Sequence, residues 1–436
     1  MNQAEEAPIV SIEKIGAFPD QSVRLRGWLY QKRSSGKLHF LQLRDGTGII
    51  QCVAGRGDVS DTLFEELGTL GQESSLEVYG VVRVDPRARS GFELHLSDAR
   101  VFQNAEGYPI TPKEHGVAFL LDHRHLWLRS RRPHAMLRIR AEVERACHAF
   151  LEARGFLRLD APVLTPAACE GTTTLFETEY FGSRAYLTQS GQLYSEAGCQ
   201  AFGRVYCFGP TFRAEKSKTR RHLTEFWMVE PEAAFLDLEG NIELAEALTC
   251  AIVERVLEHR REELEILERD LAPLERVRAP FPRISYRQAL ALLEREGQPV
   301  KPGDDLGGDE ETVLAGLFDR PVVVHGYPST LKPFYMKRDP DDPSVALNMD
   351  ILAPEGYGEI VGGSVREENL DALDAQMAEK GVDPGPLEWY RDLRRFGSVP
   401  HAGFGLGLER TVTWISGVHH LRETIPFPRL MGRLHP

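Results

Sequence analysis

The stretch FRAEKSKTRRHLTEF, residues 212–226, reads as two strand ends joined by a polar, strongly basic loop. RVYCFGPTF runs into it and TEFWMVEPEAAF includes its end, which favours an antiparallel hairpin. Arg213 and Glu215 are two residues apart, so they share one face of an extended chain. A charged hairpin with a purely structural role would have the same sequence pattern. The neighbouring elements are therefore needed to tell whether this hairpin binds a ligand.

Helices and strands are grouped around this hairpin rather than strictly alternating. Apolar residues at helical spacing predict helices over 136–156 and 239–267, and a third helix is expected at 192–202. KPGDDLGGDEET, residues 301–312, is expected to be a loop. Further strands are expected within 320–328, 346–354, 356–367 and 401–415, the last turning into a helix. This grouping predicts an α+β domain with a largely antiparallel sheet over 136–436.

The first hundred residues have a different pattern. Four or five short strands with Gly and Asp-Gly punctuation predict a small all-β barrel of the oligonucleotide-binding type over 1–103. Between Lys14 and Arg56 there are eight Lys or Arg against two Asp. An ordinary solvated β surface would also carry such charge. Interleaved aromatic residues favour a platform on which single-stranded bases stack: they are Trp28, Tyr30, His39 and Phe40.

Residues 104–135 are expected to be a hinge or linker between the two domains. The segment 123–140 has six arginines and no acid, which suits either a nucleic-acid contact at the junction or a solvated helix start. The whole chain has 436 residues and a formal charge of −13, which argues against a general polyanion binder. Six cysteines without a C-x-x-C pair argue against a zinc ribbon or a disulfide framework. With no signal-like start and no long apolar run, the expectation is a cytoplasmic protein without membrane association.

MDILAPEGYGEIVGGSVRE, residues 349–367, carries groups suited to a metal and an anion. Asp350 and Glu359 are hard oxygen ligands that, together with a nucleotide's phosphates, could hold Mg²⁺. The Gly-Gly pair that begins at Gly362 leaves room for a small ligand, and Arg366 can project into the same cavity. The segment therefore predicts a binding site on its two strands.

GFGLGLER, residues 403–410, resembles a dinucleotide loop only superficially. Its glycines alternate at Gly403, Gly405 and Gly407, whereas a dinucleotide loop needs G-x-G-x-x-G. Alternate glycines on a strand give a bare face on which another group can lie flat. Arg410, at the start of the following helix, can reach a phosphate or stack on an adenine.

These elements, in this order, resemble the signature motifs of class II aminoacyl-tRNA synthetases. GFLRLDAPVLTP around Pro162 resembles the dimer-interface motif, 212–226 the second motif, and 403–415 with LRETIPFPR (421–429) the third. RGWLYQKRSSGKLHFLQLRDGTGIIQCV is similar to the anticodon-binding OB-fold of the aspartyl, asparaginyl and lysyl subclass. The resemblance covers essentially the whole chain. It implies an antiparallel-sheet catalytic domain after an OB-fold barrel, a homodimer, and the use of ATP, Mg²⁺ and tRNA.

The segment QSGQLYSEAGCQAF, residues 189–202, helps to identify the amino acid that the enzyme would use as its substrate. Aspartyl enzymes of this subclass carry QSPQLYKQ, and their lysine pairs with the substrate's carboxylate; here Ser195 stands in its place, and Gly191 replaces the proline. Burying an unpaired negative charge is costly. Arg366 could receive an amide oxygen, and Glu225 is assigned to accept the amide N–H. The resemblance therefore implies ATP-dependent attachment of L-asparagine to tRNA(Asn) through an adenylate.

The resemblance also implies a role for each matching residue. Arg213 and Arg410 would be catalytic. The nucleotide would contact Arg213, Glu215, His222, Leu223, Phe226, Glu359, Gly407 and Arg410. The amino acid would contact Glu170, Gln189, Gln192, Ser195, Glu225, Gly362 and Arg366. The anticodon would contact Arg26, Phe40, Gln51 and Glu93, and Mg²⁺ would be held by Glu359 and Asp350.

Three alternatives stay open from the residues alone. The first is an aspartyl enzyme, which could charge both tRNA(Asp) and tRNA(Asn). The second is a synthetase-derived enzyme that makes free asparagine from aspartate and ammonia, although a basic barrel with Phe40 and Gln51 has no use there. The third is a nucleic-acid-binding protein built on the barrel alone, against which Arg213, Glu359 and Arg410 speak.

Overall fold

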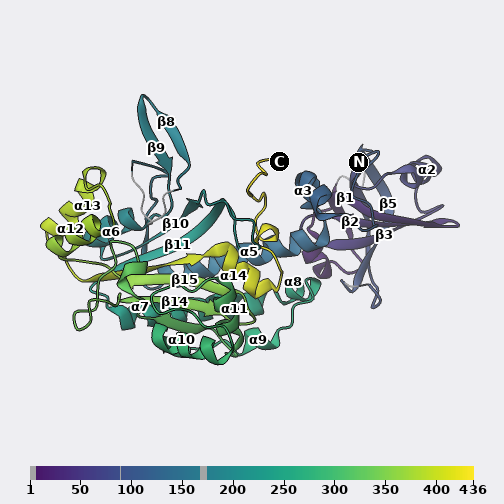
Figure 1. Ribbon diagram of the computed structural model, residues 1–436. Helices are drawn as coiled ribbons and strands as arrows, with labels where there is room; N and C mark the ends of the chain where they lie inside the picture. The colour runs from purple at the N-terminus through teal and green to yellow at the C-terminus, as the bar shows by residue number, and fades with distance from the viewer. Residues whose placement is uncertain (1–5, 89, 167–173) are drawn as a thin grey trace. The chain divides into compact units, whose positions relative to one another are not determined.

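The computed structural model describes residues 6–88, 90–166 and 174–436, and the chain falls into two compact units that divide after Gly116 (Figure 1). The predicted linker 104–135 is therefore not a separate piece, because residues from Val117 onward belong to the second unit. Within 117–135, α3 (Val117–Asp122) and α4 (Arg124–Trp127) precede α5, which starts at Arg131. No helix of the described residues is long and apolar enough to cross a membrane.

The first unit is a closed five-stranded barrel, which confirms the predicted OB-fold. Around the barrel the strands follow the order β1-β2-β3-β5-β4. Alternate residues of each strand point inward and form a continuous apolar core, as a half-buried sheet requires. The elements are β1 (Ser22–Ser35), β2 (Leu38–Arg44), β3 (Ile49–Gly55), α2 (Asp61–Thr69), β4 (Ser75–Val84) and β5 (Phe92–Gln103).

The second unit is built on an eight-stranded sheet in the order β12-β13-β14-β15-β16-β11-β10-β6. Neighbouring strands are antiparallel except at the two ends, where β12 pairs with β13 and β10 with β6 in parallel. The α+β class with a largely antiparallel sheet is thus confirmed. The strands are β6 (Leu157–Arg158), β10 (Arg204–Phe212), β11 (Glu225–Ala234), β12 (Arg283–Ser285), β13 (Val322–His325), β14 (Asn348–Ala353), β15 (Gly358–Val365) and β16 (His401–Gly407).

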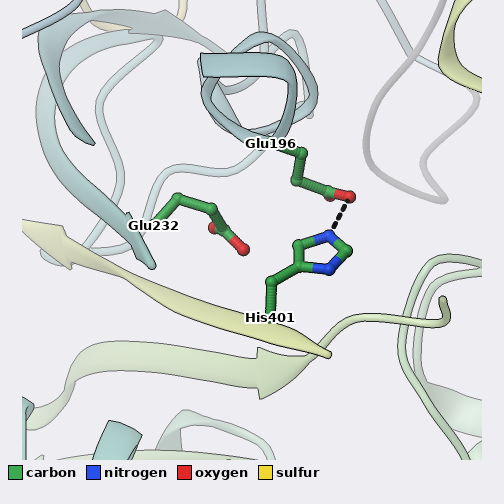
Figure 2. A group of neighbouring side chains, drawn as sticks. All are labelled: Glu196, Glu232 and His401. Atoms are coloured by element: carbon green, nitrogen blue, oxygen red, sulfur yellow. Dashed lines mark hydrogen bonds and ion pairs between the residues drawn. The ribbon is translucent and has the colours of Figure 1, made fainter. Parts of the chain in front are cut away.

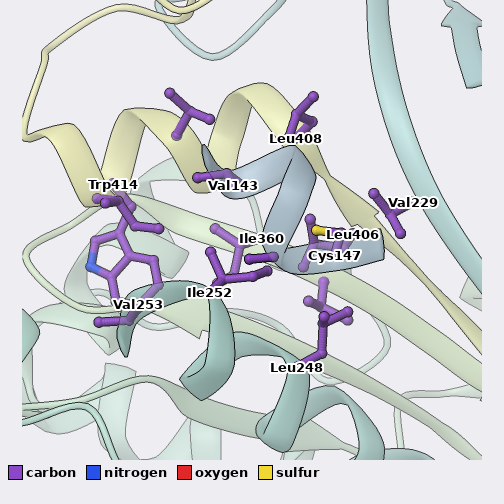
Figure 3. Packing of buried hydrophobic residues seen from close by; sticks show 14 of the residues in the cluster. Val143, Cys147, Val229, Leu248, Ile252, Val253, Ile360, Leu406, Leu408 and Trp414 are labelled. Atoms are coloured by element: carbon purple, nitrogen blue, oxygen red, sulfur yellow. The ribbon is translucent and has the colours of Figure 1, made fainter. Parts of the chain in front are cut away.

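Three helices bury their apolar sides in the main core of this unit (Figure 3). They are α5 (Arg131–Glu152), α7 (Leu238–His259) and α14 (Leu408–Ser416). Trp414 of α14 is fully buried beside residues of α7 such as Val253. The other elements are β7 (Leu164–Thr165), β8 (Glu177–Tyr180), β9 (Ser183–Leu187), α6 (Gln192–Phe202), α8 (Arg261–Ile266), α9 (Ala272–Glu275), α10 (Tyr286–Arg295), α11 (Gly308–Gly316), α12 (Leu370–Glu379) and α13 (Glu388–Arg395).

Two predicted boundaries were wrong. The helix expected over 239–267 is divided at Arg260, whose non-helical backbone (φ −133°, ψ 25°) separates α7 from α8. The side chain of Arg260 pairs with buried Glu142. The loop expected over 301–312 contains the start of α11. The acidic run Asp309–Glu311 lies in the first turn of α11, where the helix dipole favours negative charge.

The arginine-rich segment 123–140 includes internal structural side chains rather than a purely solvated face. Arg124 is buried, and its guanidinium donates to the carbonyl oxygens of Glu423, Ile425 and Pro426 at 2.8–3.3 Å. Arg140 is also buried and donates to Glu409 at 2.7 Å. These two arginines hold the segment after α14 and the start of α14 in place.

Candidate functional site

A cavity opens over β11, β15, β16 and α14, beneath the 213–224 loop. All eight residues that were assigned to a nucleotide line it: Arg213, Glu215, His222, Leu223, Phe226, Glu359, Gly407 and Arg410. Sequence reasoning did not assign six further lining residues to the nucleotide, namely Arg221, Met228, Ile360, Gly405, Glu409 and Leu421. The hairpin and the third motif therefore supply one site, although nearly 200 residues separate them.

Strand alternation decides which side chains of β11 face this cavity. Phe226 and Met228 line it, whereas Trp227 and Val229 pack into the main core on the other face. Glu225 follows the alternation of Trp227 and does not line the nucleotide cavity, and its assignment to the substrate amide stays a prediction. The carboxylates on the face of Met228 are those at positions 230 and 232.

The alternate glycines of β16 make room for side chains of the neighbouring strand. A Cβ atom on Gly403 would lie 2.1 Å from Oε2 of Glu232, and one on Gly405 would lie 2.6 Å from the methyl carbon of Met228. Glycine is required at position 403, where the backbone oxygen of Pro231 would also lie 2.4 Å away, whereas at position 405 the flexible end of Met228 can move aside. The bare face that the sequence predicted is thus occupied in part by β11.

Arg213 and Arg410, the two arginines that were predicted to be catalytic, make different contacts. Arg410 Nη1 donates to the backbone oxygen of Glu359 at 3.1 Å and to its Oε2 at 3.2 Å. Arg213 lies over the ring of Phe226, with 5.4 Å from Cζ to the ring centre. Its Nε is buried and has no hydrogen-bond partner among the described residues. Arg213 therefore has donor capacity that is still available to a ligand.

Asp350 and Glu359 converge on the bare face of Gly362. A Cβ atom there would lie 3.0 Å from Oε1 of Glu359 and 3.5 Å from Oδ1 of Asp350. The other oxygen of Asp350 accepts from Lys332 Nζ at 3.1 Å. Burial raises the pKa of Asp350 to about 6 against the pull of Lys332. Burial also opposes ionisation of Glu359, but Arg410, Lys332 and Arg213 lower its pKa below the ordinary value.

A third carboxylate comes from the unpredicted helix α11. Glu311 Oε2 accepts from the backbone N–H of Glu359 at 3.2 Å and lies 3.5 Å from Nη1 of Arg221. Burial, followed by the negative charge of Glu359, raises the pKa of Glu311 to about 7. Arg221 also donates to Thr312 Oγ1 and to the oxygen of Gly356, both at 2.5 Å. The basic loop is thereby tied to α11 and to the turn between β14 and β15.

Part of the predicted amino-acid site lies beside Glu230, further along the same face of β11. The backbone N–H of Gly191 donates to Glu230 Oε2 at 2.9 Å, and the hydroxyl of Ser190 donates to the same carboxylate. Gln189 and Gln192 are buried beside them, and Gln192 Nε2 donates to Glu196 Oε1 at 3.0 Å. Glu170 lies outside the described residues.

Ser195 and Arg366 complete this part of the site. Ser195 is fully buried, and its Oγ has no hydrogen-bond partner among the described residues. Arg366 makes a two-pronged ion pair with Glu232, with Nε and Nη2 each 2.9 Å from a carboxylate oxygen. Its Nη1 donates to Ser364 Oγ at 2.7 Å. The guanidinium that was expected to meet the substrate is therefore already charge-compensated.

A second buried ion pair lies next to the first and was not predicted. Glu196 accepts from Arg394 Nη2 at 2.6 Å and from Tyr390 at 2.8 Å. Glu196 also contacts His401 Nε2 at 2.9 Å, and Glu232 lies nearby (Figure 2). One carboxylate oxygen from each of Glu196 and Glu232 and one ring nitrogen of His401 all lie within 4.8 Å of one another. Burial opposes the charge of Glu196, but Arg394 and His401 lower its pKa far below 4.5.

We expect Glu196→Gln to lower the free energy of unfolding by about 3–5 kcal/mol, because it leaves Arg394 buried without its anion. The lowered pKa of Glu196 means that its contribution is present above about 4.5 and is lost as pH falls toward the folded-state pKa. Wild type should therefore lose more stability than the variant between pH 7 and 3.5. Urea unfolding at both pH values measures this, and parallel losses would contradict it.

On the barrel, the four residues assigned to the anticodon lie on the outer face. Gln51 and Glu93 are register partners on β3 and β5, and Gln51 Nε2 donates to Glu93 at 2.5 Å. Phe40 lies beneath Arg33, with 5.0 Å from Cζ to the ring centre. Arg26 is exposed and pairs with Glu77. These residues can present a stacking ring and polar groups to bases.

His39 does not belong to this platform. It points into the barrel, is buried, and stacks on Phe64 with ring centres 4.1 Å apart. Its neighbour Phe40 faces outward, as alternation along β2 requires. The aromatic platform predicted from the sequence therefore lacks one of its four members.

Comparison with known proteins agrees with this arrangement. Residues 117–431 match the family of class II tRNA synthetases (D, K and N), and residues 23–102 match the OB-fold nucleic acid binding domain. The asparagine--tRNA ligase of Sorangium cellulosum is 55% identical over 99% of this chain and 100% of its own length. An asparagine--tRNA ligase of Thermus thermophilus is 57% identical over 98% and 100%. The crystal structure of asparaginyl-tRNA synthetase from Pyrococcus horikoshii complexed with asparaginyl-adenylate has a TM-score of 0.95 at 45% identity, covering 98% of this chain and 99% of that one.

Proposed function

We propose, from the premise that this chain belongs to the class II tRNA synthetases of the D, K and N group, that it attaches L-asparagine to tRNA(Asn) through an asparaginyl-adenylate. One observation supports asparagine, rather than aspartate, as the amino-acid substrate. The position that bears a lysine in aspartyl enzymes is a buried serine, Ser195, and the nearby Arg366 is neutralised by Glu232. Such a pocket suits a neutral amide better than a carboxylate.

The first step joins the asparagine carboxylate to the α-phosphate of ATP by in-line attack and releases pyrophosphate. Arg213 grips the α-phosphate and the attacking carboxylate with its free donor capacity. Arg410 spreads the charge that develops on the phosphates, once its contact with Glu359 is exchanged for the nucleotide. Alignment and charge stabilisation suffice for this chemistry, so no protein nucleophile is needed.

The adenine is held by the remaining residues of the cavity. Phe226 stacks on one face of the ring, and Glu215 accepts from the adenine amino group. His222, Leu223 and Gly407 border the nucleotide. Gln192, together with Glu170, holds the α-amino end of the amino acid, and Gln189 also contacts the amino acid. In the second step a hydroxyl of the terminal tRNA ribose attacks the mixed anhydride and releases AMP.

Mg²⁺ fits the carboxylates at Gly362. Oδ1 of Asp350 and Oε1 of Glu359 face the same bare strand position, and both are hard oxygen donors. Lys332 occupies only the other oxygen of Asp350. Mg²⁺ seldom uses an all-protein cage, so these two residues would hold it together with phosphate oxygens and supply charge neutralisation there.

A homodimer is supported by exposed apolar side chains near the first motif. Leu157, Val163 and Leu164 are each 39–46% exposed, and a second copy would cover them. The tip of the β8–β9 hairpin adds Phe181, which is 92% exposed. We also propose a cytoplasmic location, because the tRNA product is consumed in translation there.

Charging of tRNA tests the proposal together with the barrel's role. The wild-type chain should form asparaginyl-tRNA from asparagine, ATP and a tRNA(Asn) transcript. Phe40→Ala should lower kcat/KM for tRNA about ten- to a hundredfold, because one base loses its stacking partner. Asparagine-dependent ATP–pyrophosphate exchange should stay unchanged in that variant. Synthesis of free asparagine from aspartate and ammonia, without charging, would instead support the rival activity.

A further inference from the structure

We propose that Glu311 of α11 is a positioning residue, which gives the nucleotide cavity its binding shape by holding Glu359 and Arg221 together. The inference rests on the proposed function and adds to it a residue that lies outside the three signature motifs. Glu311 does not line the cavity itself, whereas Glu359 and Arg221 both do. Any effect of Glu311 on the nucleotide must therefore pass through these two residues. Helix α11 contacts β14 and β15, beside which it lies in Figure 1.

One carboxylate oxygen of Glu311 makes both contacts. Oε2 accepts from the backbone N–H of Glu359 at 3.2 Å and lies 3.5 Å from Arg221 Nη1. The side chains of Glu311 and Arg221 are each 17% exposed, so solvent screens their attraction only in part. Without this oxygen, the N–H of Glu359 would lose its acceptor, and leaving a half-buried donor unpaired is costly.

The turn before Glu359 leaves space for the same contact. Gly358 has a φ of +76°, which lies in the left-handed region that favours glycine. A Cβ atom on Gly358 would lie 2.6 Å from Oε2 of Glu311 and 2.7 Å from Arg221 Nη1. A side chain at this position would be strained by that φ and would displace one or both groups. The start of β15 is thus shaped so that Glu311 and Arg221 can meet beside it.

Helix α11 also orients Arg221 through two further groups. Nη1 of Arg221 donates to the backbone oxygen of Gly308 at 2.9 Å, and Nη2 donates to Thr312 Oγ1 at 2.5 Å. Both acceptors belong to α11. His222 and Leu223, which directly follow Arg221 in the loop, line the nucleotide cavity. Docking of Arg221 on α11 therefore sets where these two residues lie.

Glu359 is the residue through which Glu311 acts on the metal and the phosphates. Oε1 of Glu359 faces the bare position of Gly362 together with Oδ1 of Asp350, and its Oε2 lies 3.2 Å from Arg410 Nη1. The direction of a ligating carboxylate depends on the groups that hold it from behind. By fixing the backbone N–H of Glu359, Glu311 sets the direction in which this carboxylate is offered to MgATP.

Glu311→Ala should raise the Kd for MgATP at least about tenfold, measured by titration calorimetry without an amino acid. Glu311→Gln should bind MgATP within about threefold of wild type, because its amide oxygen can still accept from the N–H of Glu359. In ATP–pyrophosphate exchange, KM for ATP should rise in the alanine variant while KM for asparagine stays unchanged. A residue that only stabilises the fold would not separate the two KM values in this way.

Asp309→Ala is the matched control. Asp309 is an exposed acid in the first turn of the same helix, so its removal deletes the same charge but leaves the contacts of Glu311 in place. The Kd for MgATP should stay within about twofold of wild type. Should Glu311→Ala fail to fold, Glu311→Met, which keeps the length of the side chain but has no carboxylate, should show the same rise in Kd.

A Kd for MgATP within about threefold of wild type, in a folded Glu311→Ala or Glu311→Met protein, would overturn the inference. Equal losses in the alanine and glutamine variants would overturn it too, because the acceptor oxygen would then not be the group that matters. Failure of the proposed function would show differently. In that case the wild-type chain itself would not activate asparagine, whereas the binding of MgATP is measured with no amino acid present.

Discussion

Arg213→Ala should lower kcat/KM for asparagine-dependent ATP–pyrophosphate exchange by about a thousandfold, the loss typical of removing a preorganised donor from a developing oxyanion. The reason lies in the state of this side chain. Its Nε is buried with no partner among the described residues, and it faces the cavity over Phe226. Donor capacity of that kind is stabilised only when a ligand accepts from it.

Arg213→Lys should recover only a small part of the activity, because an ammonium cannot grip phosphate and carboxylate at once. Arg220→Ala is the matched control: it removes an exposed arginine of the same loop that does not line the nucleotide cavity. We expect a change of less than tenfold there. Equal losses in the alanine variants at 213 and 220 would show a general charge effect and contradict the role assigned to Arg213.

Ser195→Lys should lower kcat/KM for asparagine by about a hundredfold or more. Position 195 is fully buried, so a lysine adds about three heavy atoms to a packed region at a cost of about 1–3 kcal/mol. It also brings a positive charge into a region where the buried carboxylates Glu196 and Glu232 are already paired. The ammonium would be satisfied by an acidic substrate, so aspartate should lose less activity than asparagine.

Ser195→Ala separates the charge from the loss of the serine. The serine Oγ makes no hydrogen bond to the described residues, so alanine should leave both activities within a few-fold of wild type. Full asparagine activity in a folded Ser195→Lys protein would contradict the electrostatic argument. Exchange kinetics with the two amino acids, together with a thermal melt for each variant, decide the matter.

Local sequence patterns predicted much of the fold and most of the residues that line the nucleotide cavity. The hairpin at 204–234 and the strand-to-helix turn at 401–416 were both predicted, because alternation and glycine spacing are encoded in neighbouring residues. The same holds for the placement of Arg213 and Arg410 around one cavity.

Other parts of the site depend on contacts that no local pattern contains. Arg394 and His401 meet Glu196 from about 200 residues away, and nothing around them in the sequence distinguishes them from surface charges. Lys332 is likewise a single lysine whose partner, Asp350, lies on another element. Helix α11 begins within a Gly- and Asp-rich run that is typical of loops. Tertiary pairing, rather than propensity, determines these features.

ATP–pyrophosphate exchange by the wild-type chain, with asparagine and aspartate compared side by side, is the decisive measurement of the assigned specificity. A pocket with a serine at 195 and a neutralised Arg366 should support exchange with asparagine and give at least about a hundredfold lower kcat/KM with aspartate. Strong exchange with aspartate and little or none with asparagine would show that the pocket holds an available cation, and would contradict the assigned specificity.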